Sequence, residues 1–405
     1  MSFITDMTLR DSPSLDSFGR LRTSTAHSLL DSQLTYDLQP LLWNQIISGS
    51  GAEITHDSTN RMAVLSFDST PTGGESIMQT FEYFRYSAGK SQLAFISFNF
   101  RGSNSNTLKF VGLSDGTNGI EFQNDGTNNK ITILSTTNSG NNEIIQDDWN
   151  LDVMDGTGPS GINLDISKTN IFVVDFQALY VGRVRVGFDI GGKIIYVHEF
   201  VHANELEVPY FNTANLPVRC GMTCSDTSTT SMNLICTTVI SESAEVSPEG
   251  FYFSVEGEVT ASTDRTHILS LQPKLLFNGI TNRSKFVLES VNIMNTGNNN
   301  VRWELCIGTE LTGDTTFNDV NTDYSTIEYN VNGTAEDPGI VIASGYITST
   351  NQSKGQINNM GIPFKYPITL DSDGEHRLLG RLTLLVSTTN STSNCLASIN
   401  WKEIR

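Results

Sequence analysis

The sequence is divided into short apolar runs by closely spaced turn residues, and this spacing constrains the fold more than any other feature. Between residues 60 and 245, runs such as QLAFISFNF (92–100) and TNIFVVDFQ (169–177) alternate with clusters of Gly, Asn, Asp and Ser. Successive turns lie mostly about 8–15 residues apart, a spacing typical of a β-sandwich or jelly roll. Apolar periods of 3.6 residues do not extend beyond about ten residues, so long helices are not expected. The best candidate for a short helix is SFGRLRTSTAHSLLDSQL (17–34).

The composition supports the same fold class. Charged residues make up only 17% of the chain and hydrophobic residues 38%. A surface with so few charges must be covered largely by Ser, Thr, Asn and Gly, which suits sheets joined by polar turns better than helices. We therefore predict an all-β protein, in which an N-terminal extended arm (1–45) is followed by two jelly-roll-like β-sandwich domains (46–245 and 246–405). The predicted boundary between the two domains is SAEVSPEG (243–250).

The first 45 residues differ from the rest of the chain because they are polar and contain little strand pattern. Their central stretch is DSFGRLRTS (16–24), in which a glycine permits a sharp bend between two apolar side chains. We interpret this arm as a segment that becomes ordered on another protein. The alternatives are a frayed terminus or a strap over the chain's own domain. The residues predicted to bind the partner are Phe18, Gly19, Arg20, Leu21 and Arg22.

The negative charge of the chain excludes some classes of partner. Its formal net charge of −19 repels phosphate backbones and anionic lipids, so neither nucleic acid nor a membrane is an expected partner. The sequence also lacks an apolar run of about 18 residues, the length that spans a bilayer. The first residues lack the basic and apolar regions of a secretory signal. We expect no cofactor.

The stretch GGKIIYVHEFVHANE (191–205) contains H-E-x-x-H, the pattern of zinc metalloproteases. His198 and His202 can share one zinc ion only on a helix, where residues four apart lie on the same face. The two glycines, followed by many β-branched and aromatic residues, instead predict a hairpin with a strand at 193–201. On a strand the two histidines are roughly 13 Å apart, too far to share an ion. We therefore predict no zinc protease and assign no catalytic residue.

Two further groups of residues have both a functional and a structural interpretation. DDWNLDVMDGTGPSG (147–161) resembles a calcium loop but lacks the expected glycine and glutamate, so we predict a solvated acidic turn without metal. The alternative is an irregular calcium or magnesium site formed by Asp148, Asp152 and Asp155. Several aromatic residues could stack on sugars, although such clusters are more often sandwich core or subunit contacts. They are Tyr83, Phe84, Tyr86, Tyr210 and Phe211.

The arm DSFGRLRTS, with its continuation SLLDSQLTYD, resembles the N-terminal segment of a group of tailed-bacteriophage virion proteins. Other stretches are similar to the same group, among them FEYFRYSAGKSQ (81–92), NTANLPVR (212–219), the segments 149–175 and 181–200, and the terminal WKEI. Proteins of this group are described as capsid-decorating, head-fibre or tail-fibre components. The resemblance implies a virion component with β-sandwich domains that is not an enzyme, and it brings no catalytic residues.

These observations give one expected function and two alternatives. We expect a head-fibre or decoration protein that assembles in the bacterial cytoplasm, joins the virion, and binds a capsid or tail protein through its arm. A closed homotrimer is expected because it would bury sheet edges that are otherwise prone to pairing. The first alternative is a tail-fibre or receptor-binding protein that recognises a bacterial surface glycan. The second is a hydrolase, either zinc-dependent or a glycosidase whose paired carboxylates meet only in space.

Overall fold

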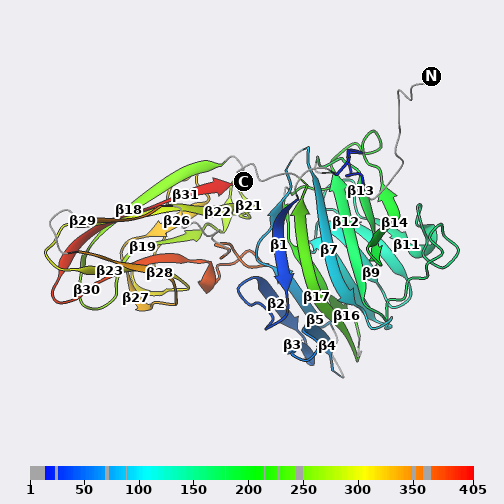
Figure 1. Ribbon diagram of the computed structural model, residues 1–405, viewed down its shortest axis with the longest axis horizontal. Coiled ribbons are helices and arrows are strands. Elements are labelled where there is room, and N and C mark those ends of the chain that lie inside the picture. Colours follow the sequence, from blue (N-terminus) through cyan, green and yellow to red (C-terminus); the bar gives the residue numbers. More distant parts are fainter. Residues whose placement is uncertain are drawn as a thin grey trace, which may run out of the picture. The chain divides into compact units, whose positions relative to one another are not determined.

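The computed structural model describes residues 14–22, 26–68, 73–87, 89–177, 179–213, 215–226, 229–242, 250–348, 353–358 and 366–405. The chain divides into two compact units, 1–246 and 247–405. In these described ranges the regular elements are strands, apart from two short 3-10 helices, Gln146–Asp148 and Leu378–Gly380 (Figure 1). The prediction of an all-β protein is confirmed. None of the helices found in these ranges is long and apolar enough to cross a membrane.

The first sheet of unit 1 has eight strands in the order β14-β13-β12-β7-β17-β4-β3, and β1 also pairs with β17. The long strand β17 pairs with β7 along one side, while β4 and β1 share its other side. The strands are β1 (His27–Gln33), β3 (Ala52–Asp57), β4 (Met62–Phe67), β7 (Ser91–Asn99), β12 (Asn170–Gln177), β13 (Val184–Ile190), β14 (Lys193–Phe200) and β17 (Thr230–Ser241).

The second sheet of unit 1 has seven strands in the order β11-β10-β9-β8-β16-β5-β2, and β6 (Phe84–Arg85) pairs with β15 (Asn215–Leu216) beside it. The two large sheets enclose an aromatic core. The Phe122 ring on β9 lies within 6 Å of the ring centroids of Phe98, Phe172 and Phe188, which come from three strands of the other sheet. The seven strands are β2 (Trp43–Ser48), β5 (Glu75–Thr80), β8 (Thr107–Ser114), β9 (Gly119–Asn124), β10 (Asn129–Leu134), β11 (Asn142–Ile145) and β16 (Val218–Cys224).

Unit 2 also contains two main sheets. One has the order β18-β31-β22-β29 and the other β25-β26-β19-β30-β23-β28. Both supply buried side chains, such as Trp401 from β31 and Leu384 from β30. The strands of the first are β18 (Phe251–Ala261), β22 (Lys285–Asn295), β29 (Ser353–Asn358) and β31 (Ser393–Ile404). Those of the second are β19 (Thr266–Pro273), β23 (Val301–Ile307), β25 (Asn318–Asp319), β26 (Ile327–Asn330), β28 (Ile340–Ile347) and β30 (Leu382–Thr388). Two small pairs are β20 (Leu276–Phe277) with β21 (Ile280–Thr281), and β24 (Glu310–Gly313) with β27 (Gly333–Asp337).

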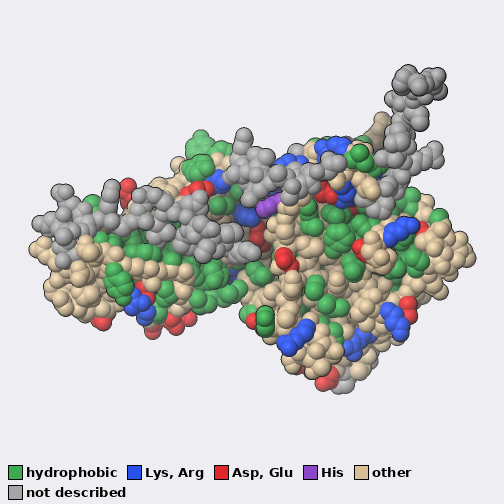
Figure 2. Space-filling view, viewed as in Figure 1, with side chains coloured by type: hydrophobic (Ala, Val, Ile, Leu, Met, Phe, Trp, Pro, Cys, Tyr) green, Lys and Arg blue, Asp and Glu red, His purple; other side chains and the backbone are tan. Residues whose placement is uncertain are grey.

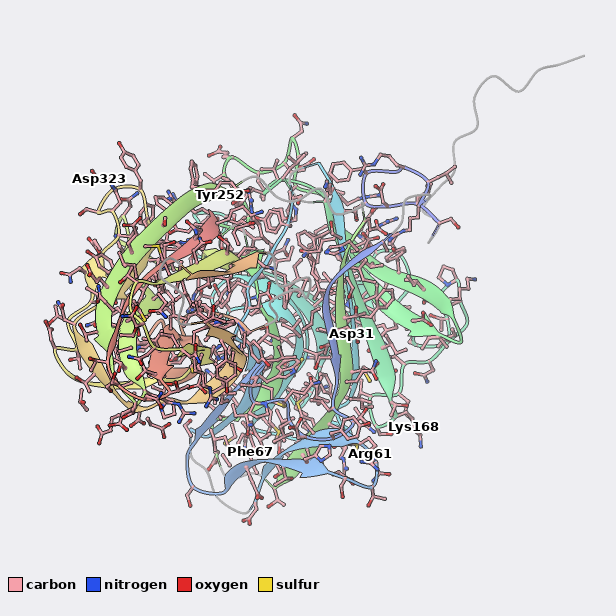
Figure 3. The ribbon with its side chains drawn as sticks, turned by 60° about the vertical axis from the view of Figure 1, so that its left-hand side comes forward. Asp31, Arg61, Phe67, Lys168, Tyr252 and Asp323 are labelled. Atoms are coloured by element: carbon pink, nitrogen blue, oxygen red, sulfur yellow. The ribbon has the colours of Figure 1, made fainter. Side chains whose placement is uncertain are left out.

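The surface has the low charge density that the composition implies. The face in view in Figure 2 carries scattered basic and acidic side chains among uncharged ones. In Figure 3 the labelled Tyr252 and Asp323 belong to unit 2, and both residues are exposed. Uncharged side chains therefore occupy much of this face, and the charged side chains do not form a continuous surface.

The structure differs from the prediction at the start of the chain. The prediction of a short helix within 17–34 was wrong, because residues 27–33 form strand β1 and pair with β17. Along β1, the buried Leu30 and Ser32 alternate with the exposed Asp31 and Gln33, which is the period of two expected of a strand with one covered face. Asp31 is labelled in Figure 3. The segment 27–48 thus supplies β1 and β2 to the sandwich and is not an extended arm.

Candidate functional site

Residues 14–22 form a small hairpin that is stabilised from within. Leu15 and Leu21 make an antiparallel bridge, and the N–H of Gly19 donates to the carbonyl of Asp16 at 2.9 Å. The Asp16 carboxylate accepts the backbone N–H of Arg20 at 2.8 Å, so this one side chain organises the turn. Gly19 has φ of +76°, a conformation that other residues adopt only with strain. The bend that the sequence predicted at this glycine is present.

The outer side of the hairpin carries three of the residues predicted to bind a partner. The Arg20 guanidinium lies 4.6 Å from the centre of the Phe18 ring and forms a 2.7 Å ion pair with Asp16. Leu21 is 57% exposed although it is apolar. The outer side is therefore a preformed surface of a ring, a leucine and a guanidinium whose charge is largely compensated.

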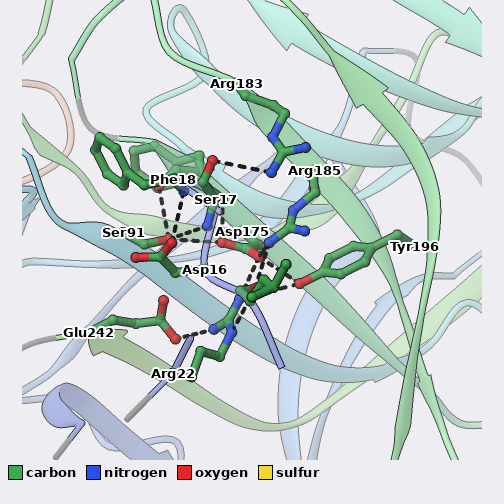
Figure 4. A network of polar contacts seen from close by, with 12 residues as sticks. Asp16, Ser17, Phe18, Arg22, Ser91, Asp175, Arg183, Arg185, Tyr196 and Glu242 are labelled. Atoms are coloured by element: carbon green, nitrogen blue, oxygen red, sulfur yellow. Dashed lines mark hydrogen bonds and ion pairs between the residues drawn. The ribbon is translucent and has the colours of Figure 1, made fainter. Parts of the chain in front are cut away.

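The inner side of the hairpin lies on a buried carboxylate of the eight-stranded sheet (Figure 4). Asp175, in β12, is fully buried. Its Oδ1 accepts the hydroxyls of Ser17 (2.5 Å) and Ser91 (2.9 Å). Its Oδ2 accepts Nη2 of Arg22 (2.6 Å), Nη2 of Arg185 (2.7 Å) and the hydroxyl of Tyr196 (2.5 Å). We call Asp175 and these five partners the Asp175 cluster.

Strand pairing explains why the Asp175 cluster forms at this place. Asp175 and Arg185 are direct neighbours across β12 and β13, so an acidic and a basic side chain lie side by side. The Arg185 guanidinium also lies 4.4 Å from the centre of the Tyr196 ring. Burial and the nearby Asp175 charge raise the pKa of Tyr196, so its hydroxyl stays protonated and donates to the carboxylate.

The hairpin is held by further contacts outside the cluster. The carbonyl of Leu15 accepts Nη2 of Arg185 at 2.9 Å and Nε of Arg22 at 3.0 Å. Arg22 also forms an ion pair with Glu242, the residue that follows β17. Burial raises the pKa of Glu242, and the Arg22 charge opposes that shift. Arg22 thus bridges two carboxylates and connects the hairpin to two strands of the sheet.

The structure therefore divides the five predicted partner-binding residues into two groups. Arg22 points into unit 1, whereas Phe18, Gly19, Arg20 and Leu21 form the outer side of the hairpin. For residues 14–22 the structure matches the alternative of a strap over the chain's own domain. Docking of the outer side on a partner stays a prediction, and the remaining predicted arm residues, 1–13 and 23–25, lie outside the described residues.

The hairpin predicted around Gly191 and Gly192 is confirmed. Ile190 and Lys193 are paired, so the two glycines form a two-residue turn, and both have positive φ (+65° and +82°). Strand β14 begins at Lys193 and ends at Phe200, one residue earlier than predicted. The local backbone is therefore extended where the zinc motif requires a helix.

The two histidines of H-E-x-x-H have separate partners. His198 Nδ1 accepts the backbone N–H of Asn150 at 3.2 Å, and burial lowers its pKa to about 4. His202 Nδ1 donates to the carbonyl of Gly182 at 2.9 Å, and its ring stacks on Tyr210 with 4.1 Å between the centroids. Within the described ranges, no three His, Cys, Asp or Glu side chains are placed to hold a metal ion.

The three acidic residues considered for calcium or magnesium have different surroundings. Asp152 is buried and accepts the backbone N–H groups of Met154 (2.9 Å) and Ser160 (2.7 Å). Asp155 is exposed and accepts hydrogen bonds within its own loop. Asp148 is exposed on the first 3-10 helix. Two of the three carboxylates therefore stabilise turns.

The aromatic cluster considered for sugar stacking is buried in unit 1. The exposed fractions of its five side chains run from 1% for Phe211 to 8% for Tyr83. The hydroxyl of Tyr86 donates to the carbonyl of Thr213 at 2.6 Å, which satisfies its polar end. The interpretation of these residues as sandwich core is confirmed, and none offers a free ring face of the kind that a sugar needs. The other members are Phe84, Tyr86 and Tyr210.

Comparison with known proteins gives likeness only at the level of three-dimensional structure. No protein-family model and no curated protein matches the sequence. A β-glucanase of Bacillus licheniformis is 12% identical, over 54% of this chain and 98% of its own, with a TM-score of 0.33. A carbohydrate esterase of the Shiga toxin-encoding bacteriophage phi24B is 12% identical, over 53% of this chain and 99% of its own, with a TM-score of 0.31. At these scores no activity, substrate or residue role transfers to this chain.

Proposed function

We propose that the chain is a structural component of a tailed-bacteriophage virion, a head-fibre or capsid-decorating protein that attaches through its N-terminal segment. One observation carries the proposal. The hairpin 14–22 is fixed to unit 1 by its inner side, while its outer side presents Phe18, Arg20 and Leu21 to solvent. A hairpin with one side fixed to a folded unit and the other side exposed is suited to binding a second protein.

Attachment of the hairpin to unit 1 lowers the entropic cost of binding a partner. A free peptide loses conformational entropy when it binds, and this loss weakens the complex. Here the turn is already closed by Asp16, and the Phe18 ring is already stacked on Arg20. The outer side therefore fits an apolar depression with polar edges on a capsid or tail protein. The resemblance of DSFGRLRTS to the arms of virion proteins supports the same partner class, and the proposal assigns no catalytic role to the chain.

Self-association into a homotrimer is part of the proposal. Among the described strands, β28 has one sheet neighbour, β23, and it lies at the end of the six-stranded order. Its sequence IVIASGYI carries no charge, and Ile340, Val341 and Tyr346 are 45%, 39% and 73% exposed. Such an edge favours pairing with another strand, because no strand of the described ranges pairs with the other side of β28. Sedimentation of the full chain should show an oligomer, and Val341→Lys should shift it towards the monomer.

Attachment is tested in the phage that encodes the chain. The variant Phe18→Ala/Leu21→Ala removes the apolar outer side but none of the contacts to Asp175, so we expect a folded protein that no longer joins particles. The matched control is Tyr36→Ala, which removes a side chain that is 89% exposed elsewhere in unit 1. Densitometry of purified particles measures incorporation. Full occupancy by the double variant would falsify the proposal.

A further inference from the structure

Unit 2 contains an open pocket of about 410 Å³ that has no counterpart in the sequence predictions. Its volume lies within the range of about 300–1,000 Å³ that is usual for small-molecule sites. One side of the pocket is apolar and the other carries charged side chains. The lining residues used below are Lys274, Leu276, Phe277, Asp319, Glu328 and His376.

The apolar side is formed by the short hairpin of β20 and β21. Asn278 and Gly279 form its two-residue turn with positive φ (+51° and +78°), the conformation that this pair of residues favours. The hairpin presents Leu276, which is 57% exposed, and Phe277. The Arg405 guanidinium lies 4.7 Å from the centre of the Phe277 ring and packs against it. The apolar side is therefore firmly held and yet open to solvent.

The charged side is formed by two carboxylates on neighbouring strands. Asp319 on β25 and Glu328 on β26 are direct cross-strand neighbours, an arrangement that is unfavourable for like charges unless they are compensated. Lys274 Nζ lies 3.0 Å from Oδ1 of Asp319. Oε1 of Glu328 accepts the amide of Gln272 at 2.5 Å and lies 3.5 Å from Nε2 of His376. Each carboxylate is thus fixed through one of its two oxygens.

The second oxygen of each carboxylate is available to a ligand. In the described ranges, Oδ2 of Asp319 and Oε2 of Glu328 have no hydrogen-bond or ion-pair partner. The exposed side-chain fraction is 42% for Asp319 and 18% for Glu328, so both are reached by solvent. The two acceptors come from paired residues of neighbouring strands, and Lys274 Nζ, which also donates to the carbonyl of Asn321 at 2.9 Å, supplies a donor beside one of them.

We propose that this pocket binds a neutral sugar ring. Neighbouring hydroxyls of the sugar donate to Asp319 and Glu328, the Lys274 ammonium donates to a ring or hydroxyl oxygen, and the apolar C–H face packs against Leu276 and Phe277. An anionic sugar is disfavoured because two carboxylates repel it. A divalent cation is disfavoured because the Lys274 ammonium already lies beside Asp319. The inference does not depend on the proposed attachment to a virion.

The test measures sugar binding by the full chain. The probes are the methyl glycosides of glucose, galactose, mannose and rhamnose at millimolar concentration, followed by saturation-transfer NMR, together with an array of neutral bacterial oligosaccharides. We expect at least one of these sugars to bind, and Asp319→Asn/Glu328→Gln to weaken that binding at least tenfold. The matched control is Glu256→Gln on β18, which changes an exposed carboxylate outside the pocket. Its binding should equal that of the wild type.

Further measurements distinguish a loss of sugar binding from a loss of folding. If the double variant does not fold, Leu276→Asp replaces it, since it alters only an exposed side chain at the apolar side and should also abolish binding. The proposal is overturned if none of the probes binds, or if binding survives in the pocket variants. Calcium binding that is lost in the pocket variants, without any sugar binding, also overturns it. Incorporation of Glu328→Gln into particles is expected to be normal, which separates this result from the attachment test.

Discussion

The Asp175 cluster of unit 1 and the pocket of unit 2 begin from the same arrangement and end differently. Each places a carboxylate beside a second ionisable side chain on a neighbouring strand, Arg185 in unit 1 and a second carboxylate in unit 2. In unit 1 the hairpin 14–22 covers the carboxylate, and five donors saturate it. In unit 2 each carboxylate keeps one oxygen accessible. The difference therefore has two sources: Asp175 faces an opposite charge across the strands, and the hairpin adds the donors Ser17 and Arg22.

The largest expected difference between the two regions concerns stability. Asp175→Ala leaves the guanidinium groups of Arg22 and Arg185 without their shared carboxylate, so we expect a loss of about 3–5 kcal/mol in the free energy of unfolding. Asp319→Ala removes a carboxylate that is 42% exposed, and Lys274 Nζ keeps its hydrogen bond to the carbonyl of Asn321, so the loss should be less than about 1 kcal/mol. Chemical denaturation of both variants measures this contrast. Equal losses would show that the Asp175 cluster is not the more tightly coupled of the two.

Acid should weaken both units, because burial lowers the pKa of His198 and His202 in unit 1 and of His267 in unit 2. Burial lowers the pKa of His198 and of His267 to about 4, whereas an unfolded histidine titrates near 6.5. The unfolded chain therefore binds more protons between these values, and the free energy of unfolding falls as the pH falls from about 6.5 to about 4. The loss reaches about 3 kcal/mol for each of His198 and His267 at pH 4.

Calorimetry at several pH values measures this acid effect. His198→Gln should remove the part of the pH dependence that comes from His198 and leave the parts that come from His202 and His267. A pH dependence unchanged by this substitution would show that other groups control the acid response.

A smaller effect is expected for the hydroxyl that ties the hairpin to Asp175. Ser17→Ala removes a 2.5 Å hydrogen bond to a buried charge, so we expect a loss of about 1.5–3 kcal/mol in the stability of the docked hairpin. Trypsin should then cleave after Arg20 and Arg22 faster than in the wild type. Ser139→Ala, in a loop of unit 1 away from the cluster, is the control and should leave the cleavage rate unchanged.

The smallest effect on stability is expected in the pocket. Glu328→Gln keeps the shape of the side chain and an oxygen that can accept from Gln272, so the free energy of unfolding should change by less than about 1 kcal/mol. Thermal unfolding of this variant measures the change. A large loss would mean that the pocket carboxylates serve stability, as Asp175 does, and would weaken the comparison.

The fold was largely predictable from the sequence because turns and strands are local features. The Gly191–Gly192 turn and the strand after it follow from a few adjacent residues. The prediction of a helix within 17–34 was wrong because Leu30 and Leu34 fit both the helical period of 3.6 and the strand period of two. Pairing with β17 makes this segment a strand. Tertiary contacts override local propensity in such segments.

The candidate sites were much less predictable. The Asp175 cluster joins Ser17 and Ser91 to a strand more than eighty positions further along the chain, and no local pattern encodes that distance. A signal was nevertheless present, because Asp175 and Arg185 each interrupt a run of apolar strand residues. The pocket gave no such signal, since Asp319 and Glu328 lie in a polar stretch and become neighbours only through strand pairing.

The contacts of the hairpin also determine how the chain responds to mechanical load. A pull applied upstream of residue 14 acts first on hydrogen bonds and ion pairs to β12, β13 and the end of β17, which share the tension in parallel. Strand β1, which pairs with β17 immediately downstream, is shielded from being peeled away residue by residue. Unit 1 is thereby built to carry tension from its N-terminal end into the middle of a sheet.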